Sequence, residues 1–212
     1  MDTRVADQLR LRGGHLDFIG RSHIWIDDYD RADSAQFAQF ALANALAHTA
    51  PGQLEVLVFD DALKGMAAPF QEVNSGGEKI LRHINDLQEL NETIKYLHEH
   101  ARSVLNVIQG RTESLLDFRQ QLSPKVEGFK LVVLSTIYHL LSDEIRDKLT
   151  VLLKAGPAAG VTFLIHSMKL NVNEEILNLT QLCDVEERTV YGNDGAVRGQ
   201  FDPQSADDLI SV

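Results

Sequence analysis

Three short segments of this chain are predominantly apolar and rich in valine and leucine. They span Leu54–Phe59, Phe129–Ser135 and Val161–His166. A strand with one solvent-exposed face alternates apolar and polar residues, whereas a parallel strand covered on both faces is apolar along most of its length. Stretches with helical spacing separate the three segments. The pattern predicts an α/β fold with a mainly parallel sheet and helices on both faces.

Helices are predicted where apolar residues recur every three or four positions. Ser142 is placed to cap one of them, and Pro51-Gly52 stops another. The predicted helices are Ser34–His48, Glu78–Ile108, Ser114–Arg119, Ser142–Ala155 and Asn173–Asn178. A further strand is predicted near Leu182–Arg188, and the tail from Gly192 reads mostly as turn.

The composition limits the class of protein. A chain of 212 residues, 44% hydrophobic and 24% charged, can bury a globular core. We expect residues 1–14 to be an exposed lead-in and residues 15–212 to form a single domain. The only cysteine, Cys183, cannot form an internal disulfide, which favours the reducing cytoplasm. A net charge of −11 argues against DNA as a partner. No apolar run reaches the roughly 18 residues of a membrane span, so we expect membrane contact only through a larger assembly.

The stretch from His23 to Ala35 has the frame of a phosphate-binding loop without its chemistry. His23–Asp27 is predicted to be a strand, and a helix is predicted to begin at Ser34. A phosphate cradle in such a frame uses glycines, whose backbone N–H groups wrap the phosphates, and a lysine. This loop has neither. It carries four aspartates instead, and their charge repels a triphosphate. They are Asp27, Asp28, Asp30 and Asp33.

Three other segments resemble motor ATPases of the FtsK/SpoIIIE type. Gly156–Ile165 reads GPAAGVTFLI and is similar to that family's strand entry G-R-A-A-G-I-H-L-I. Phe59–Phe70 is similar to its strand that ends in aspartate and continues into a loop of small residues. Arg111–Arg119 is similar to the helix before its Walker B strand. The order and spacing resemble most closely the ATPase modules of type VII secretion motors, and the resemblance implies a RecA-like P-loop NTPase fold.

The same resemblance implies that the catalytic positions carry other residues here. The lysine of the P-loop is replaced by Ser34, and the hydroxyl that holds Mg²⁺ is replaced by Ala35. The Walker B strand ends in Ser135-Thr136, where the family has Asp-Glu. The degenerate nucleotide-pocket positions are Asp28, Asp30, Arg31, Asp33, Ser34, Ala35, Ser135, Thr136, His166 and Ser167. We therefore expect no catalytic residue, no metal site and no tight binding of ATP or Mg²⁺.

Without the catalytic residues, the resemblance implies a docking, substrate-recognition or regulatory module of a protein-secretion motor. The resemblance implies two kinds of partner, which are other ATPase modules of the same motor and the signal helix of a secreted protein. A possible partner-binding pocket includes Trp25, Tyr29 and Asp60. Trp25 can equally be a core residue.

Other classes of function remain open from the residues alone. An active motor subunit could borrow catalytic groups from a neighbour, although a phosphate cradle has to come from the chain's own backbone. The loop aspartates with Asp60 and Asp61 could bind a divalent cation, or they could simply cap the helix that follows and solvate the loop. A receiver-like domain is a separate possibility, with Asp60-Asp61, Ser135-Thr136 and Lys169 each following a strand. Ser135, His166 and Asp60 match a catalytic triad by residue type, but no nucleophile-elbow glycines surround Ser135. Asn74–Lys79 resembles an ABC-type signature and reads more simply as a turn.

Overall fold

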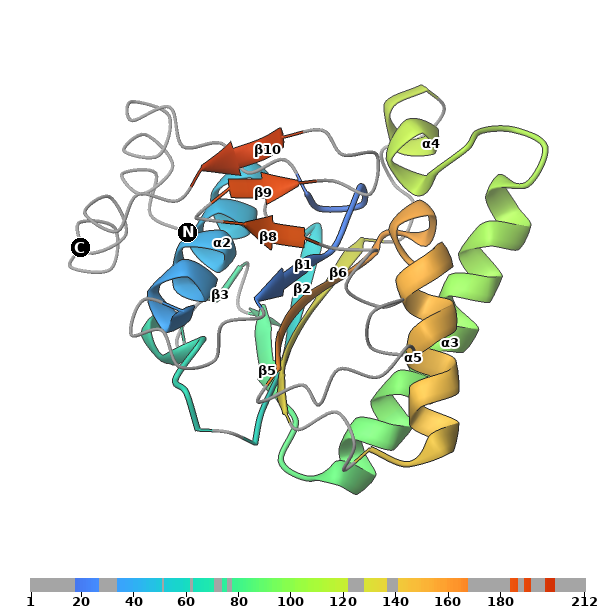
Figure 1. Cartoon of the computed structure of the whole chain (residues 1–212). Helices are drawn as coiled ribbons and strands as arrows, with labels where there is room; N and C mark the ends of the chain where they lie inside the picture. The colour runs from blue at the N-terminus through green and yellow to red at the C-terminus, as the bar shows by residue number, and fades with distance from the viewer. Residues whose placement is uncertain are drawn as a thin grey trace.

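Five strands form one parallel sheet in the computed structural model of the chain (Figure 1). The structure describes residues 18–26, 34–50, 52–61, 63–70, 74–75, 78–121, 128–136, 141–167, 184–186, 189–191 and 197–200. The strands are β1 (Ile24–Ile26), β2 (Leu54–Asp60), β5 (Leu81–His83), β6 (Phe129–Thr136) and β7 (Val161–Ser167). Their order is β1-β7-β6-β2-β5, and every neighbouring pair is parallel. The predicted parallel sheet is confirmed.

Helices cover both faces of this sheet, which also confirms the prediction. α2 (Ser34–His48) lies on one face, and α3 (Leu87–Ile108) and α5 (Asp143–Ala155) lie side by side on the other (Figure 1). α4 (Leu115–Gln121) follows α3, and two 3-10 turns, η1 (Ala68–Phe70) and η3 (Pro157–Ala159), complete the connections.

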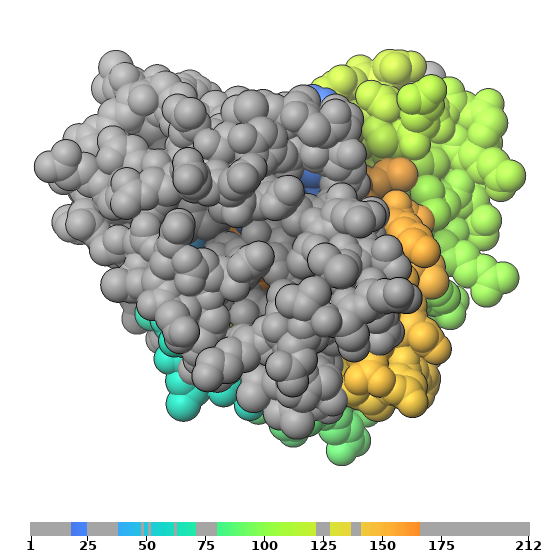
Figure 2. Space-filling model, viewed as in Figure 1, coloured from blue at the N-terminus to red at the C-terminus, as the bar shows by residue number. Residues whose placement is uncertain are grey.

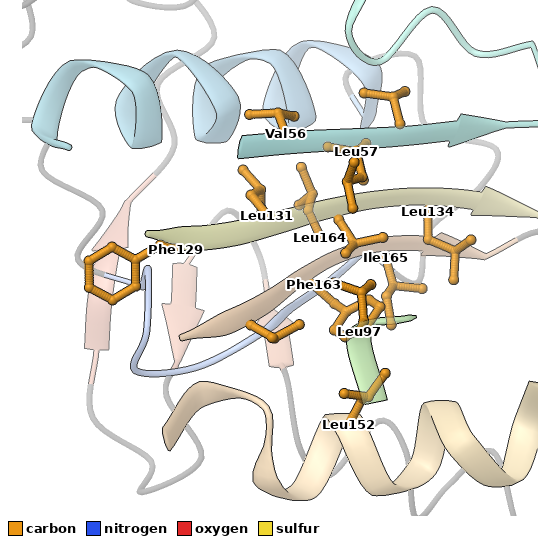
Figure 3. Packing of buried hydrophobic residues seen from close by; sticks show 14 of the residues in the cluster. Val56, Leu57, Leu97, Phe129, Leu131, Leu134, Leu152, Phe163, Leu164 and Ile165 are labelled. Carbon is orange, nitrogen blue, oxygen red and sulfur yellow. The ribbon is translucent and has the colours of Figure 1, made fainter. Parts of the chain in front are cut away.

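The core lies on both sides of the sheet because successive strand residues point to opposite faces. In Figure 3, Phe163 and Ile165 of β7 point toward Leu97 of α3 and Leu152 of α5, and all four side chains are buried. Leu164, between them in the sequence, points to the α2 side. This double coverage explains why the strands read as apolar runs rather than as an alternation.

The prediction of one helix over Glu78–Ile108 is wrong in its first part. Leu81–His83 is the edge strand β5, parallel to β2. The helix begins only at Leu87, because the Asp86 carboxylate accepts a hydrogen bond from the Glu89 N–H at 2.8 Å. The Glu89 carboxylate in turn accepts from the N–H of Asn85, the residue before the cap, at 2.9 Å, so both side chains fix the turn at which the helix begins. The apolar residues before this cap fit helical spacing, but so short a run does not distinguish helix from strand.

A hairpin precedes this edge strand. β3 (Asn74–Ser75) pairs antiparallel with β4 (Glu78–Lys79). This pairing argues against a signature motif that opens a helix, because the ends of Asn74–Lys79 are strands; Gly76 and Gly77, where the turn was predicted, lie outside the described residues.

The C-terminal part forms a second, antiparallel sheet. Its strands are β8 (Asp184–Glu186), β9 (Thr189–Tyr191) and β10 (Val197–Gln200), in the order β10-β9-β8. The predicted strand at Leu182–Arg188 contains β8, whereas the prediction of turn for the tail is wrong at β10. The predicted helix Asn173–Asn178 lies outside the described residues.

A buried histidine fastens β1 to β7 and α5. His23 Nδ1 accepts a hydrogen bond from the Phe163 N–H at 2.9 Å, and Nε2 lies 3.0 Å from the Leu153 carbonyl oxygen. Because the Phe163 amide can only donate, the imidazole proton must be on Nε2, which donates to Leu153. The His23 and Phe163 rings also meet edge-on, with centroids 5.5 Å apart. Burial in this position lowers the pKa of His23 to about 4.

Acidification is therefore expected to destabilise the fold through His23. The pKa lies near 6.5 in the unfolded chain and at about 4 in the folded one, so the unfolded chain takes up the proton first as the pH falls. The His23 contribution is complete above about pH 6.5 and is lost by about pH 4, with a total near 3 kcal/mol. Urea denaturation over this range measures it. The difference in stability between the wild type and His23→Gln should shrink as the pH falls, and a constant difference would refute the assignment.

Candidate functional site

The carboxyl ends of the parallel strands bring predicted site positions into register. Asp60 of β2 is the partner of Ser135 of β6, which is the partner of His166 of β7. One position further on, Thr136 pairs with Ser167. The element after β1 is α2 and the element after β6 is α5, on opposite faces of the sheet (Figure 1). In open α/β sheets, ligands bind outside the carboxyl ends where successive connections diverge to opposite faces.

The Asp60 carboxylate is engaged by its own loop. Oδ1 accepts a hydrogen bond from the Lys64 N–H at 2.9 Å, and Oδ2 accepts from the N–H groups of Gly65 at 2.7 Å and Met66 at 3.4 Å. A carboxylate that satisfies three backbone donors shapes the loop and is poorly placed to hold a metal ion or to orient a histidine. The sequence predicted a pocket residue here and did not reveal this loop-forming role, because no fixed spacing marks such a turn.

β6 ends in two buried, uncharged side chains. Ser135 is 0% exposed and Thr136 is 3% exposed. Among the residues that the structure describes, the Thr136 hydroxyl has no hydrogen-bond partner. An Asp-Glu pair at this edge would hold Mg²⁺ and polarise the attacking water, and a buried pair of hydroxyls supplies neither charge. The catalytic triad interpretation is also unsupported, because Ser135 is enclosed and Asp60 is bonded to loop amides.

The frame of the predicted phosphate loop is present, although the loop itself lies outside the described residues. Trp25 is the middle residue of β1, and Ser34 and Ala35 are the first two residues of α2. These positions confirm the predicted strand and helix. Of the predicted site residues, Asp28, Tyr29, Asp30, Arg31 and Asp33 lie outside the described ranges, and so does Asp27 of the aspartate cluster.

Two absences hold for the described part of the chain. Within it, no group of three or more His, Cys, Asp or Glu side chains could hold a metal ion. No helix in these ranges is both long and apolar enough to cross a membrane.

Comparison with known proteins gives matches among solved structures only. No protein-family model matches the chain, and a search of curated proteins finds no match. The cytoplasmic domain of EssC matches with a TM-score of 0.62 and 12% identity, over 90% of this chain and 44% of that one. ATPases 2 and 3 of Thermomonospora curvata EccC, in complex with a signal sequence peptide, match with a TM-score of 0.56 and 14% identity, over 89% of this chain and 41% of that one. The conjugation coupling protein TcpA of pCW3, solved with ATPγS, matches with a TM-score of 0.57 and 12% identity, over 91% of this chain and 65% of that one.

At such low identities the similarity establishes the fold. The chain spans less than half the length of the EssC and EccC chains that it matches. The expected RecA-like P-loop fold is confirmed, and so is the resemblance to FtsK-like motors at this level. By its fold, the chain is similar to the cytoplasmic domain of EssC, to the ATPase domains of the type VII secretion protein EccC and to the coupling protein TcpA.

Proposed function

We propose that this chain is a catalytically inactive module of an FtsK/SpoIIIE-like translocation motor, and that it acts in docking, substrate recognition or regulation during protein secretion. The observation that carries the proposal is the end of β6, where Ser135 and Thr136 stand buried at the Walker B position. The Asp60 carboxylate, which is in register beside Ser135, is bonded to its own loop and does not replace the missing acid.

The chemistry of phosphoryl transfer supports this proposal. Catalysis depends on a backbone cradle and a lysine for the phosphates, on carboxylate and hydroxyl ligands for Mg²⁺, and on a group that orients water. The stretch from His23 to Ala35 has no glycine and no lysine, and it contains four aspartates. One missing element could be compensated by a neighbouring subunit. The cradle cannot be supplied in this way, because its donors are the chain's own amides.

The structural matches suggest the kind of assembly in which this chain acts. The EccC structure contains two ATPase domains and a signal sequence peptide, and this chain spans about two fifths of it. We propose that the partner is another ATPase module of the same motor or the signal helix of a secreted protein, on the cytoplasmic side of a membrane-bound assembly. The net charge of −11 argues against DNA as the cargo.

An assay of phosphate release tests the loss of turnover. With ATP, Mg²⁺ and either DNA or none, the purified chain is expected to release phosphate at the rate of the buffer control. A rate that separates from the chain on a further chromatographic step belongs to a contaminating enzyme. Turnover of about 1 per second or more that stays with the chain through that step would contradict the proposal.

A further inference from the structure

One leucine combines high exposure with an unusual backbone conformation. Leu63 is 88% exposed, and its φ of 53° lies in the left-handed region. Among the described residues other than glycine, it is the only one with a positive φ. A residue other than glycine in this region is destabilised by contact of its Cβ with the backbone, and Asn and Asp tolerate the region best. The fold therefore presents a large apolar side chain to water from a conformation that disfavours it.

The loop that carries Leu63 is firmly held on both sides. The Asp60 carboxylate binds the amides of Lys64, Gly65 and Met66, and the Leu63 N–H donates to the Asp60 carbonyl at 3.1 Å. From α2, the Gln39 side-chain amide donates to the Gly65 carbonyl at 2.9 Å. Met66 is 0% exposed and anchors the loop in the core. The loop is thus preorganised, and it leaves the Leu63 side chain outside.

Exposed apolar residues are common singly and need no explanation in themselves. Tyr96, Val107 and Val151 are examples on helices, each about half exposed and with ordinary helical backbone. Leu63 differs because its left-handed backbone and its high exposure are both unfavourable, and the hydrogen bonds of the surrounding loop hold it in this conformation. Strain that the structure maintains in this way is concentrated at binding sites and functional loops.

We infer that Leu63 is a docking anchor that inserts into an apolar pocket with a basic rim on a neighbouring RecA-like domain. The inference rests on the proposed function and names the residue that would make the contact. A protruding side chain needs a concave, folded partner, whereas a signal helix is itself convex and needs a groove. Beside Leu63 the loop carries two acidic residues, Asp60 and Asp61, against one basic residue, Lys64; with the net charge of −11 this favours a basic rim and disfavours DNA or an anionic membrane surface. In Figure 2 the segment around residues 60–70, coloured teal, lies at the margin of the molecule, where such a partner has access.

Photocrosslinking in cells of the source organism tests this contact. With Leu63→p-benzoylphenylalanine in the full chain, we expect a crosslinked peptide that mass spectrometry assigns to a RecA-like ATPase domain. Position 107 on α3, probed in the same way, is the control and should not capture that domain. Crosslinking from position 63 to a second copy of this chain or to a secreted protein, no crosslink at all, or equal capture from position 107 would overturn the inference.

Two variants separate docking from folding. Leu63→Asn relieves the backbone, so we expect its Tm to rise by about 2 °C while co-purification with the ATPase domain falls about tenfold. Leu63→Met keeps an apolar anchor and should retain co-purification. If Leu63→Asn lowers the Tm, or if it binds as the wild type does, the inference fails. Both readouts are independent of ATP turnover, so the failure of this inference and the failure of the proposed function are distinguishable.

Discussion

Replacing His23 by phenylalanine is expected to destabilise the chain by about 4 kcal/mol, since it leaves two buried polar groups without partners. Phenylalanine fills much the same space and keeps the ring contact with Phe163. It can neither accept from the Phe163 N–H nor donate to the Leu153 carbonyl, which the imidazole contacts at 2.9 and 3.0 Å. The effect should be larger than for an ordinary core substitution of equal volume, because β1 has three residues and depends on this link to α5.

The matched control is His23→Gln, whose amide can satisfy one of the two backbone groups. We expect it to destabilise by roughly half as much as phenylalanine does. Urea denaturation at about pH 7, where the wild-type imidazole is neutral, gives both values. Equal stability of the wild type and His23→Phe would show that the two hydrogen bonds make no net contribution.

Gly156→Ala is expected to destabilise by about 3 kcal/mol, although the backbone angles alone suggest the opposite. Gly156 has φ −57° and ψ −46°, a helical conformation in which alanine is normally favoured over glycine. An added Cβ, however, would overlap the Leu152 carbonyl oxygen and lie 2.8 Å from that of Val161. Both atoms belong to the backbone, and the Gly156 N–H and carbonyl are bonded to these same two residues at 2.7 and 2.8 Å. The junction of α5 and β7 must shift for the methyl group to fit.

Gly110→Ala provides the contrast for Gly156→Ala. Gly110 has φ +74° and nothing within 4 Å of an added Cβ, so only the backbone penalty of about 1 kcal/mol remains. Thermal unfolding should then lower the Tm by roughly 6–12 °C for Gly156→Ala and by about a third of that for Gly110→Ala. The reverse order, with Gly110→Ala the more damaging, would mean that left-handed strain outweighs the backbone clash.

The main strands could be predicted because their environment is uniform. β2, β6 and β7 are covered on both faces, so nearly every position in them is apolar and the segments stand out in the sequence. The end of α5 was marked equally clearly by Gly156 and Gly160, and its start by the Ser142 cap, whose hydroxyl accepts from the Ile145 N–H. Local signals and tertiary burial agree at these places.

The start of α3 could not be predicted from periodicity, because β5 places Leu81 at helical spacing from the apolar residues that follow. Only the N-cap at Asp86, together with the hydrogen bond from the Asn85 N–H to Glu89, marks the true boundary. The same limit applies to single residues. Nothing in the sequence around His23 indicates that its ring joins a strand and a helix more than a hundred residues away, because such contacts depend on the completed fold.

For the site, the sequence predicted which residues end the strands but not what their side chains do. Asp60, Ser135 and His166 do come into register across three strands. The engagement of Asp60 by its own loop and the left-handed backbone of Leu63 depend on the conformation of residues 61–66, which no spacing rule describes.

Calorimetric titration of the purified chain with ATP–Mg²⁺ tests the loss of the nucleotide site most directly. We expect no saturable heat up to about 1 mM nucleotide, because neither the loop before α2 nor the end of β6 offers the groups that hold a triphosphate and its metal. Saturable binding with a Kd of about 10 µM or tighter would contradict the proposal that this RecA-like domain has lost its nucleotide site.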